Sequence, residues 1–155
     1  MANVPESVAS FLQGRRFAVA GVSRDGNLPA NGIFKKLKAS GFDPVPVNPN
    51  AETVEGVPCY PNLAAIPGAI DGVVIAAHPD VAAGLVRQAA ALGVKQVWFH
   101  RSFGEGSVSQ AALDACRAAG IEPIVGGCPL MYCAPVDVAH RCFRWWLGFK
   151  GRLPA

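Results

Sequence analysis

The chain has 155 residues, of which 51% are hydrophobic and 16% are charged, and its formal net charge is +3. This composition excludes a disordered chain and a coiled coil, and the charge is too small to indicate binding to nucleic acid. No apolar run approaches the length of a membrane span, and the N-terminal segment lacks the features of a signal peptide. We therefore expect a soluble, cytoplasmic protein that has neither nucleic acid nor membrane as a partner and whose charge suits an anionic small molecule.

Cysteine usage agrees with a reducing compartment. The number of cysteines is odd, and no C-x-x-C pair occurs. The five residues are Cys59, Cys116, Cys128, Cys133 and Cys142. In the cytoplasm such residues are mostly small buried apolar side chains, so we expect most of them in the core.

Short apolar runs alternate with stretches of helical periodicity along the chain. The expected strands are 17–20, 44–47, 72–77, 96–99 and 121–125. The expected helices are 31–40, 79–92 and 107–119, with a helical turn at 63–66 and a last helical stretch over 136–152. Pro79 suits a first helical position, and Pro44 and Pro46 suggest a twisted or irregular second strand.

This rhythm is typical of an α/β protein. It predicts a Rossmann-like doubly wound parallel sheet of about five strands, with helices on both faces. Right-handed crossovers favour the strand order 3-2-1-4-5. We expect a single domain over 1–155, in which 134–155 forms a C-terminal helical extension.

The candidate binding residues are those that leave the strands. In such sheets a ligand binds beyond the carboxyl ends of the strands, where the strand order reverses. The predicted order places that point between the first and fourth strands. The candidates there are Gly21, Val22, Ser23, Asn48, Pro49, Asn50, His78, Pro79, His100 and Cys128. Asn31, at the start of the next helical stretch, is a further candidate binding residue.

The segment after the first strand, 21–26, is a candidate phosphate-binding turn. Gly21 lets backbone N–H groups approach a phosphate, and Ser23 can donate a further hydrogen bond. The segment is neither G-x-G-x-x-G nor a P-loop, and a plain strand-to-helix turn that needs glycine is the alternative interpretation. If the turn holds phosphate, we expect Gly21 and Ser23 to matter for binding and not for folding.

The end of the second strand argues against NAD. Dinucleotide folds usually place Asp or Glu there to bind the ribose hydroxyls, whereas this chain has the neutral Asn48 and Asn50. Uncharged amides tolerate a phosphorylated ribose better than a carboxylate does. Ordinary Asn-Pro turn chemistry explains the same residues, and both interpretations can hold together.

Several motifs together carry a family resemblance. They are A-V-A-G-V-S, L-P-A-N with Asn31, G-F-D-P-V-P-V-N-P-N, V-E-G-V-P-C-Y-P-N-L-A-A-I-P, V-W-F and C-P-L-M-Y. In this combination, over about 16–132, the chain resembles the stand-alone CoA-binding domain proteins, which are similar to the nucleotide-binding domain of the succinyl-CoA synthetase α subunit. The resemblance implies that 21–23 holds CoA phosphate and that 48–50 lies near the adenosine. It also implies no counterpart of the synthetase's phosphorylated histidine, which belongs to a second domain.

Two segments depart from that pattern. Where the family leads us to expect an aromatic or basic residue, the chain has Ala76-Ala77-His78-Pro79. Where a glutamine-and-glycine turn is expected, the chain has 100–106, which begins with His100 and Arg101. Both loops would flank the pantetheine arm, so the departures bear on which CoA derivative is the ligand.

His78, His100 and Cys128 form a second candidate constellation. A Cys–His pair acts as nucleophile and base in some enzymes, and a His/Cys set binds zinc. The spacing of metal ligands is absent, however. We therefore predict that His78 is a capping neighbour of a helix, that His100 lines the pocket, that Cys128 belongs to a Cys-Pro turn, and that no catalytic residue or metal is present.

The C-terminal stretch 136–152 places Val138, Cys142, Trp145 and Phe149 on one helical stripe, with basic residues beside it. A membrane-surface or partner helix is one interpretation. We prefer a final helix packed on the sheet or on a second subunit, which includes a homodimer through this helix.

Three functional hypotheses follow. The first is a non-catalytic module that binds coenzyme A or an acyl-CoA as a nucleotide-type ligand. The second is a small NADP-type or other nucleotide-dependent enzyme, which the neutral second-strand end and the missing glycine weaken. The third is an interaction protein with a vestigial pocket, which the intact turn weakens.

Overall fold

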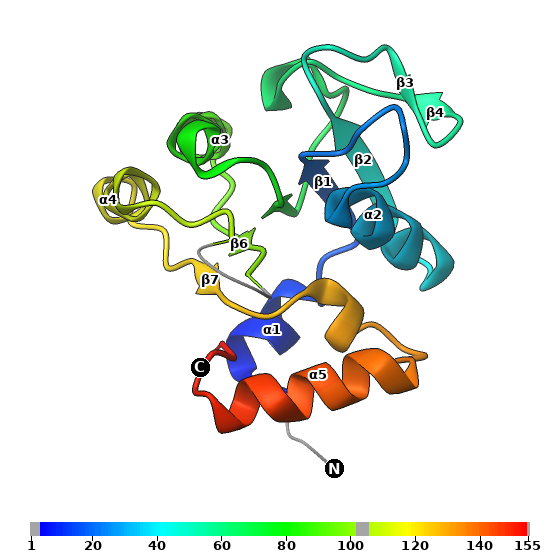
Figure 1. Ribbon diagram of the computed structural model, residues 1–155. Coiled ribbons are helices and arrows are strands. Elements are labelled where there is room, and N and C mark those ends of the chain that lie inside the picture. The colour runs from blue at the N-terminus through cyan, green and yellow to red at the C-terminus, as the bar shows by residue number, and fades with distance from the viewer. Residues whose placement is uncertain (1–3, 102–105, 155) are drawn as a thin grey trace.

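A five-stranded parallel sheet forms the centre of the molecule in the computed structural model, which describes residues 4–101 and 106–154. The strands of the sheet are β1 (Arg16–Ala20), β2 (Asp43–Val47), β5 (Gly72–Ile75), β6 (Val97–Phe99) and β7 (Ile124–Val125). The helices are α1 (Glu6–Phe11), α2 (Pro29–Ala39), α3 (Pro79–Ala91), α4 (Gln110–Ala118) and α5 (Val138–Phe149). The remaining elements are the 3₁₀ turns η1 (Leu63–Ala65) and η2 (Pro129–Met131) and the hairpin strands β3 (Thr53–Val54) and β4 (Val57–Pro58). The predicted α/β Rossmann-like class is confirmed (Figure 1).

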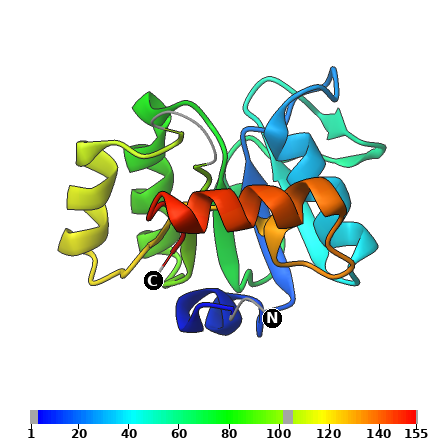
Figure 2. The ribbon, with the colours of Figure 1, turned by 60° about the horizontal axis from the view of Figure 1, so that its bottom comes forward.

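Helices cover both faces of the sheet, as expected. Successive strand residues point to opposite faces, so β1 contributes to two separate cores. Phe17 and Val19 pack with residues of α1, α2 and η2. Ala18 and Ala20 pack with residues of α3, α4 and η1. Figure 2 shows α5 crossing the molecule on the side of α1 and α2.

The predicted strand order is wrong. The observed order is β2-β1-β5-β6-β7, so the second strand lies at the edge of the sheet instead of inside it. The physical reason is in the two prolines of β2. Asp43 N–H bonds Arg15 on the β1 side, whereas Pro46 C=O and Asn48 N–H bond Tyr60 on the other side. Pro44 and Pro46 therefore lack donors on the outer edge, where a further strand would need them.

Two local features also differ from the expectations. Helix α4 begins at Gln110, three residues later than predicted, because Ser109 is its N-cap and accepts a hydrogen bond from Ala112 N–H at 3.1 Å. The hairpin β3–β4 has no counterpart among the expected elements. Its pairing is short, and it lies beyond the edge strand β2 (Figure 1).

Helix α5 does not pack its apolar stripe on the sheet, which was one of the two packings expected for it. The side chains of the predicted stripe are mostly in solvent: Val138 is 73% exposed, Trp145 is 74% exposed and Phe149 is 81% exposed. The buried residue of this helix is Leu147, at 1%. The expectation that the stripe packs on the sheet is therefore wrong. Among the described residues, no helix combines the length and apolar character that crossing a membrane requires.

Candidate functional site

A pocket of about 710 Å³ lies beyond the carboxyl ends of β1, β2 and β5 and against the first part of α3. It brings together six of the predicted binding residues, namely Gly21, Val22, Ser23, Asn48, Pro49 and His78. The strand order reverses between β1 and β5, so the site follows the rule for open α/β sheets. Its position between the first and third strands replaces the predicted one between the first and fourth.

Gly21 lies where two strand ends approach each other closely. Its φ is +103°, and a Cβ placed on it would lie 2.3 Å from the carbonyl oxygen of Ala76, directly after β5. That distance leaves no space for any side chain, and the conformation itself favours glycine. The expectation that Gly21 matters only for binding is therefore wrong, because a larger residue would push apart the ends of β1 and β5.

The buried side chain of Asn31 is hydrogen-bonded to the backbone of the turn. Its side chain has no exposed surface, its Oδ1 accepts the Ser23 N–H at 2.8 Å, and its Nδ2 donates to the Ser23 carbonyl at 2.8 Å. The same Nδ2 donates to Glu55 Oε1 at 3.0 Å, which ties the β3–β4 hairpin to the turn. Glu55 in turn lies 3.5 Å from Lys35. Asn31 does not line the pocket, contrary to the expectation that it binds the ligand, and instead fixes the shape of the turn.

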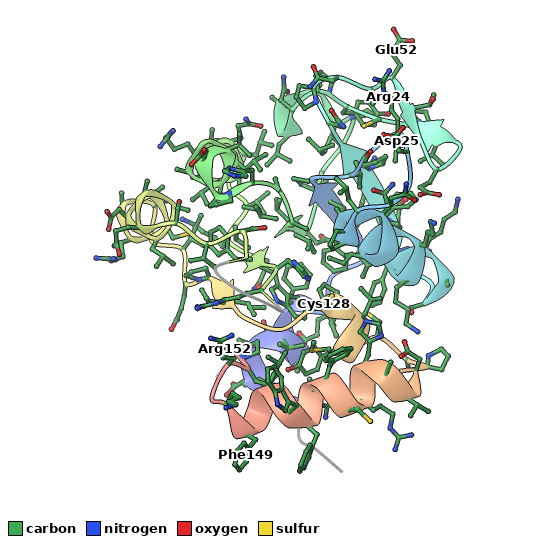
Figure 3. All side chains as sticks on the ribbon, viewed as in Figure 1. Arg24, Asp25, Glu52, Cys128, Phe149 and Arg152 are labelled. Carbon is green, nitrogen blue, oxygen red and sulfur yellow. The ribbon has the colours of Figure 1, made fainter. Side chains whose placement is uncertain are left out.

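The turn keeps hydrogen-bond donors for a ligand. The Ser23 Oγ accepts the Asp25 N–H at 3.1 Å, which leaves the hydroxyl proton available. The backbone N–H groups of Val22 and Arg24 have no hydrogen-bond partner within the part of the chain that the structure describes. Figure 3 shows Arg24 and Asp25 at the end of the molecule opposite α5. Such a turn can receive an anionic group through backbone donors.

Asn48 connects the end of β2 to the same turn. Its Nδ2 donates to the Val22 carbonyl at 2.8 Å, and its Oδ1 accepts the Asn50 N–H at 2.8 Å. The turn chemistry weighed for this segment is thus present, together with a place in the pocket wall for Asn48 and Pro49. Asn50 is exposed and does not line the pocket.

His78 and Pro79 begin α3. The His78 Nδ1 accepts the Asp80 N–H at 3.3 Å and lies 3.2 Å from the Asp80 carboxylate, while Pro79 takes the first helical position. The prediction of His78 as a capping neighbour is confirmed, and the residue also borders the pocket. Pro79 does not line the pocket.

His100 and Cys128 lie outside the pocket lining, contrary to expectation. Burial lowers the pKa of His100, which follows β6. Cys128 is 4% exposed within the core, and burial raises the pKa of its thiol to about 12. A thiol with that pKa is protonated at neutral pH and is a poor nucleophile. Residues 102–105 of the predicted loop 100–106 lie outside the described part of the chain.

Helix α3 contributes pocket residues that the sequence reasoning missed. Asp80, Gly84, Arg87 and Gln88 line the pocket from one helical face. Gln88 Oε1 also accepts the Leu63 N–H at 3.0 Å and so fixes η1 beside the site. The spacing of four, three and one residues along a predicted helix was the available signal. Arg87 is the arginine in this wall, and its charge suits an anionic ligand.

Within the described residues, no three His, Cys, Asp or Glu side chains cluster in a way that could hold a metal ion. The pocket instead combines an apolar floor with a few polar groups. Ala20, Ala76 and Leu85 belong to its wall, together with the turn and Arg87. This combination is common for sites that bind an organic cofactor.

Comparison with known proteins gives related chains. Over 80 residues the chain is 35% identical to "Acetate--CoA ligase [ADP-forming] II" of Archaeoglobus fulgidus, a match that covers 50% of this chain and 12% of that protein. A protein of Pyrococcus horikoshii OT3 is 27% identical, with a TM-score of 0.72 over 83% of this chain and 93% of that chain. A protein of Pyrococcus furiosus is 31% identical, with a TM-score of 0.62 over 70% of this chain and 90% of that chain.

The family model described as "CoA binding domain" matches residues 15–134. This range contains the whole sheet, the turn after β1 and all the residues of the pocket. It ends before α5, so the pocket and α5 differ in their relation to the family. The chain belongs to the CoA binding domain family.

Proposed function

We propose that this protein binds coenzyme A or an acyl-CoA in the pocket beside the turn after β1 and acts as a non-catalytic module. The observation that carries the proposal is the pocket itself, at the reversal point of the sheet and within the segment that matches the family. Its volume of about 710 Å³ falls within the range of about 300–1,000 Å³ that is usual for small-molecule sites.

The phosphates of the ligand bind at the turn in this proposal. The N–H groups of Val22 and Arg24 and the hydroxyl of Ser23 are donors that the turn itself does not use. Arg87 adds a positive charge from the wall of α3. Because Asn31 and Asn48 hold the turn from behind, the donors keep their positions before a ligand arrives.

The end of β2 favours coenzyme A over NAD. Asn48 is uncharged, and its side-chain amide is hydrogen-bonded to Val22 and Asn50. This residue therefore provides no carboxylate at the position where dinucleotide folds bind the ribose hydroxyls. A phosphorylated ribose meets no like charge at this residue. Asp80, the acidic residue of the pocket wall, lies at the start of α3 and is paired with His78.

The state of the cysteines supports a binding role in a reducing compartment. All five are unpaired, and four of them are buried. The Cys128 thiol has a pKa of about 12, which argues against a nucleophilic role for this buried residue. We propose the cytoplasm as the compartment, where free thiols persist.

Isothermal titration calorimetry with four ligands tests the proposal. We expect coenzyme A to bind most tightly, dephospho-coenzyme A to bind more weakly, and NADH and NADPH to bind weakest. Arg87→Ala should weaken coenzyme A binding about tenfold, which corresponds to about 1.4 kcal/mol. Arg117→Ala is the matched control, because Arg117 is an exposed arginine that pairs with Asp114 on α4, outside the pocket lining.

Binding of NADPH without binding of coenzyme A would overturn the assignment. Equal loss of affinity in the Arg87 and Arg117 variants would show that a general positive charge, and not this pocket, attracts the ligand. A thermal shift with coenzyme A provides an independent readout, because a ligand that binds only the folded state stabilises it by about 2.7 kcal/mol at a hundredfold excess over Kd.

A further inference from the structure

Helix α5 carries an exposed apolar stripe formed by Val138, Cys142, Trp145 and Phe149. Their spacing of four, three and four residues is the spacing of one seam of a two-helix pair. Trp146 borders the stripe and is 40% exposed. Figure 3 shows Phe149 on the outer side of α5, away from the sheet. Soluble monomers seldom expose a continuous patch of such large side chains.

The inner face of α5 is already occupied by contacts with the rest of the chain. Leu147 is 1% exposed in the core, and Arg144 donates to the Met131 carbonyl at 3.2 Å. The Arg144 guanidinium also lies 5.0 Å from the centre of the Tyr132 ring. The stripe therefore cannot turn inward without loss of these contacts, so it stays on the outer face of the helix.

We propose that the stripe pairs with the stripe of a second copy of this chain, with the two α5 helices antiparallel about a two-fold axis. An axis that passes midway between positions 143 and 144 places Val138 opposite the partner's Phe149. It also places Cys142 opposite the partner's Trp145. A small side chain thus meets a large one at each position, which is the complementarity that a packed interface needs.

The charges at the two ends of α5 agree with the antiparallel direction. Asp137 begins α5, where its carboxylate lies 2.6 Å from the His140 ring and its side chain is 54% exposed, and Lys150 follows the helix end, so an antiparallel pair brings the acidic end of one helix to the basic end of the other. Antiparallel helices also place the positive end of one helix dipole near the negative end of the other. An acidic residue at one end and basic residues at the other are self-complementary only when the helices run in opposite directions.

The size of the interface sets the expected strength. A helix of 12 residues is about 18 Å long, so one pair of helices buries less surface than a standard interface of about 1,600 Å². We therefore expect a dimer with a dissociation constant in the micromolar range, as is usual for small interfaces. The association then depends on protein concentration.

Sedimentation equilibrium of the full chain in the presence of a reductant tests this pairing. The reductant is needed because the exposed thiol of Cys142 could otherwise form a disulfide. We expect a monomer–dimer equilibrium for the natural chain. Trp145→Glu should abolish the dimer without a change in the thermal stability of dilute protein, because Trp145 is 74% exposed. Leu92→Glu is the matched control, since Leu92 is an exposed apolar residue on the helix end of α3.

Exchange of the small and large residues tests the register. Cys142→Trp alone places two large side chains opposite each other, so we expect the dimer to weaken at least tenfold. The double variant Cys142→Trp, Trp145→Cys restores one small and one large residue at each contact and should return the dissociation constant to within about threefold. A natural chain that stays monomeric at all concentrations would overturn the proposal.

A membrane surface is the competing occupant, and the same variants distinguish it. A helix that lies on a membrane gains affinity from each added aromatic residue. Retention of monomeric protein on phosphatidylserine vesicles, tighter for Cys142→Trp and weaker at high salt, would contradict pairing with a second copy. Absence of vesicle binding together with the predicted exchange behaviour supports it.

Discussion

The turn after β1 and the helix α5 differ in where their hydrogen-bonding and apolar groups find partners. Behind the turn, the polar side chain of Asn31 in α2 is fully buried and bonds both the N–H and the carbonyl of Ser23. In α5, the largest apolar side chains are exposed to solvent and only Leu147 is buried. The turn has its shape fixed by the chain itself, whereas the outer surface of α5 has no partner within the described residues of its own fold. The first arrangement supports the proposed binding site, and the second supports the proposed pairing of α5 helices.

Gly21→Val, at the start of the turn, should cause the largest loss of stability among these variants. It places a β-branched side chain at φ +103° and its Cβ 2.3 Å from the Ala76 carbonyl oxygen. Backbone strain and overpacking each cost about 1–3 kcal/mol, so we expect a loss of about 4 kcal/mol in the free energy of unfolding. Urea denaturation measures the change.

Gly32→Ala is the control for this glycine. Gly32 lies within α2, and a Cβ placed on it would meet no atom within 4 Å. An alanine there should leave stability unchanged or raise it by up to about 1 kcal/mol, since alanine is the better helix former. If Gly21→Val were as stable as Gly32→Ala, the close approach of β1 and residue 76 would be wrong.

Leu147→Ala should have the next largest effect, because it separates the two faces of α5. Leu147 belongs to the same core cluster as Phe17 and Trp98, and its truncation should lower the free energy of unfolding by about 3 kcal/mol. Trp145→Ala, measured in dilute protein, should cost less than about 0.5 kcal/mol, as is usual for an exposed residue. Equal losses in the two variants would show that the outer face of α5 is also buried.

A truncation that removes α5 would affect the core as well as the exposed stripe. Deletion from Val136 onward would remove Leu147 and the contact of Arg144 with Met131 and Tyr132. Such a truncation would therefore expose core surface as well as remove the stripe. Single substitutions on the outer face separate these two effects.

Asn31→Ala should lower the stability by a smaller amount and should also weaken ligand binding in the pocket. It removes the acceptor of the Ser23 N–H and the donor to the Ser23 carbonyl and to Glu55. An unpaired buried group costs about 1–3 kcal/mol, so we expect a loss of about 2 kcal/mol and weaker binding of coenzyme A. Calorimetry and urea denaturation measure both. Asn27→Ala, at an exposed position in the same segment, should change neither by more than about 0.5 kcal/mol.

The smallest expected effect lies at the amino end of β1, away from the pocket. Asp71 accepts the N–H groups of Arg15 and Arg16 at 2.8 Å, and hydrogen bonds from Arg16 and Arg15 lower its pKa. Because the folded pKa is lowered, the stabilisation is present above the ordinary value near 3.9 and decreases as the pH falls through the folded pKa. Urea denaturation below about pH 4 should show this loss.

Asp71→Asn is the control for the pH dependence, because the amide does not titrate. Its stability should be lower than that of the natural chain at neutral pH, and the two should converge as the pH falls through the lowered folded pKa of Asp71. Parallel pH profiles of the two proteins would contradict a role for the Asp71 carboxylate at the start of β1.

The site was predictable in part. Glycine and serine after the first strand, and asparagine after the second, correctly indicated the turn and the pocket wall, because strand ends and turn residues are local features. His100 and Cys128 also follow strands, since His100 comes directly after β6 and Cys128 lies between β7 and η2. Both residues nevertheless lie outside the pocket lining. Arg87 was missed because it lies two turns into a helix, where position along the chain does not reveal which face meets the ligand.

The sequence by itself determined the alternation of strands and helices, their approximate bounds and the need for glycine after β1. These features depend on periodicity and on backbone conformation within a few residues. Only the tertiary structure decided the strand order, the position of Cys128 outside the pocket lining and the direction in which α5 presents its apolar stripe. The apolar stripe of α5 indicated a surface to be covered, but periodicity does not say by what. Since Leu147 and Arg144 already join the helix to the core and to η2, the stripe is left outside. Burial depends on what lies across the interface, and that is set by contacts between distant parts of the chain.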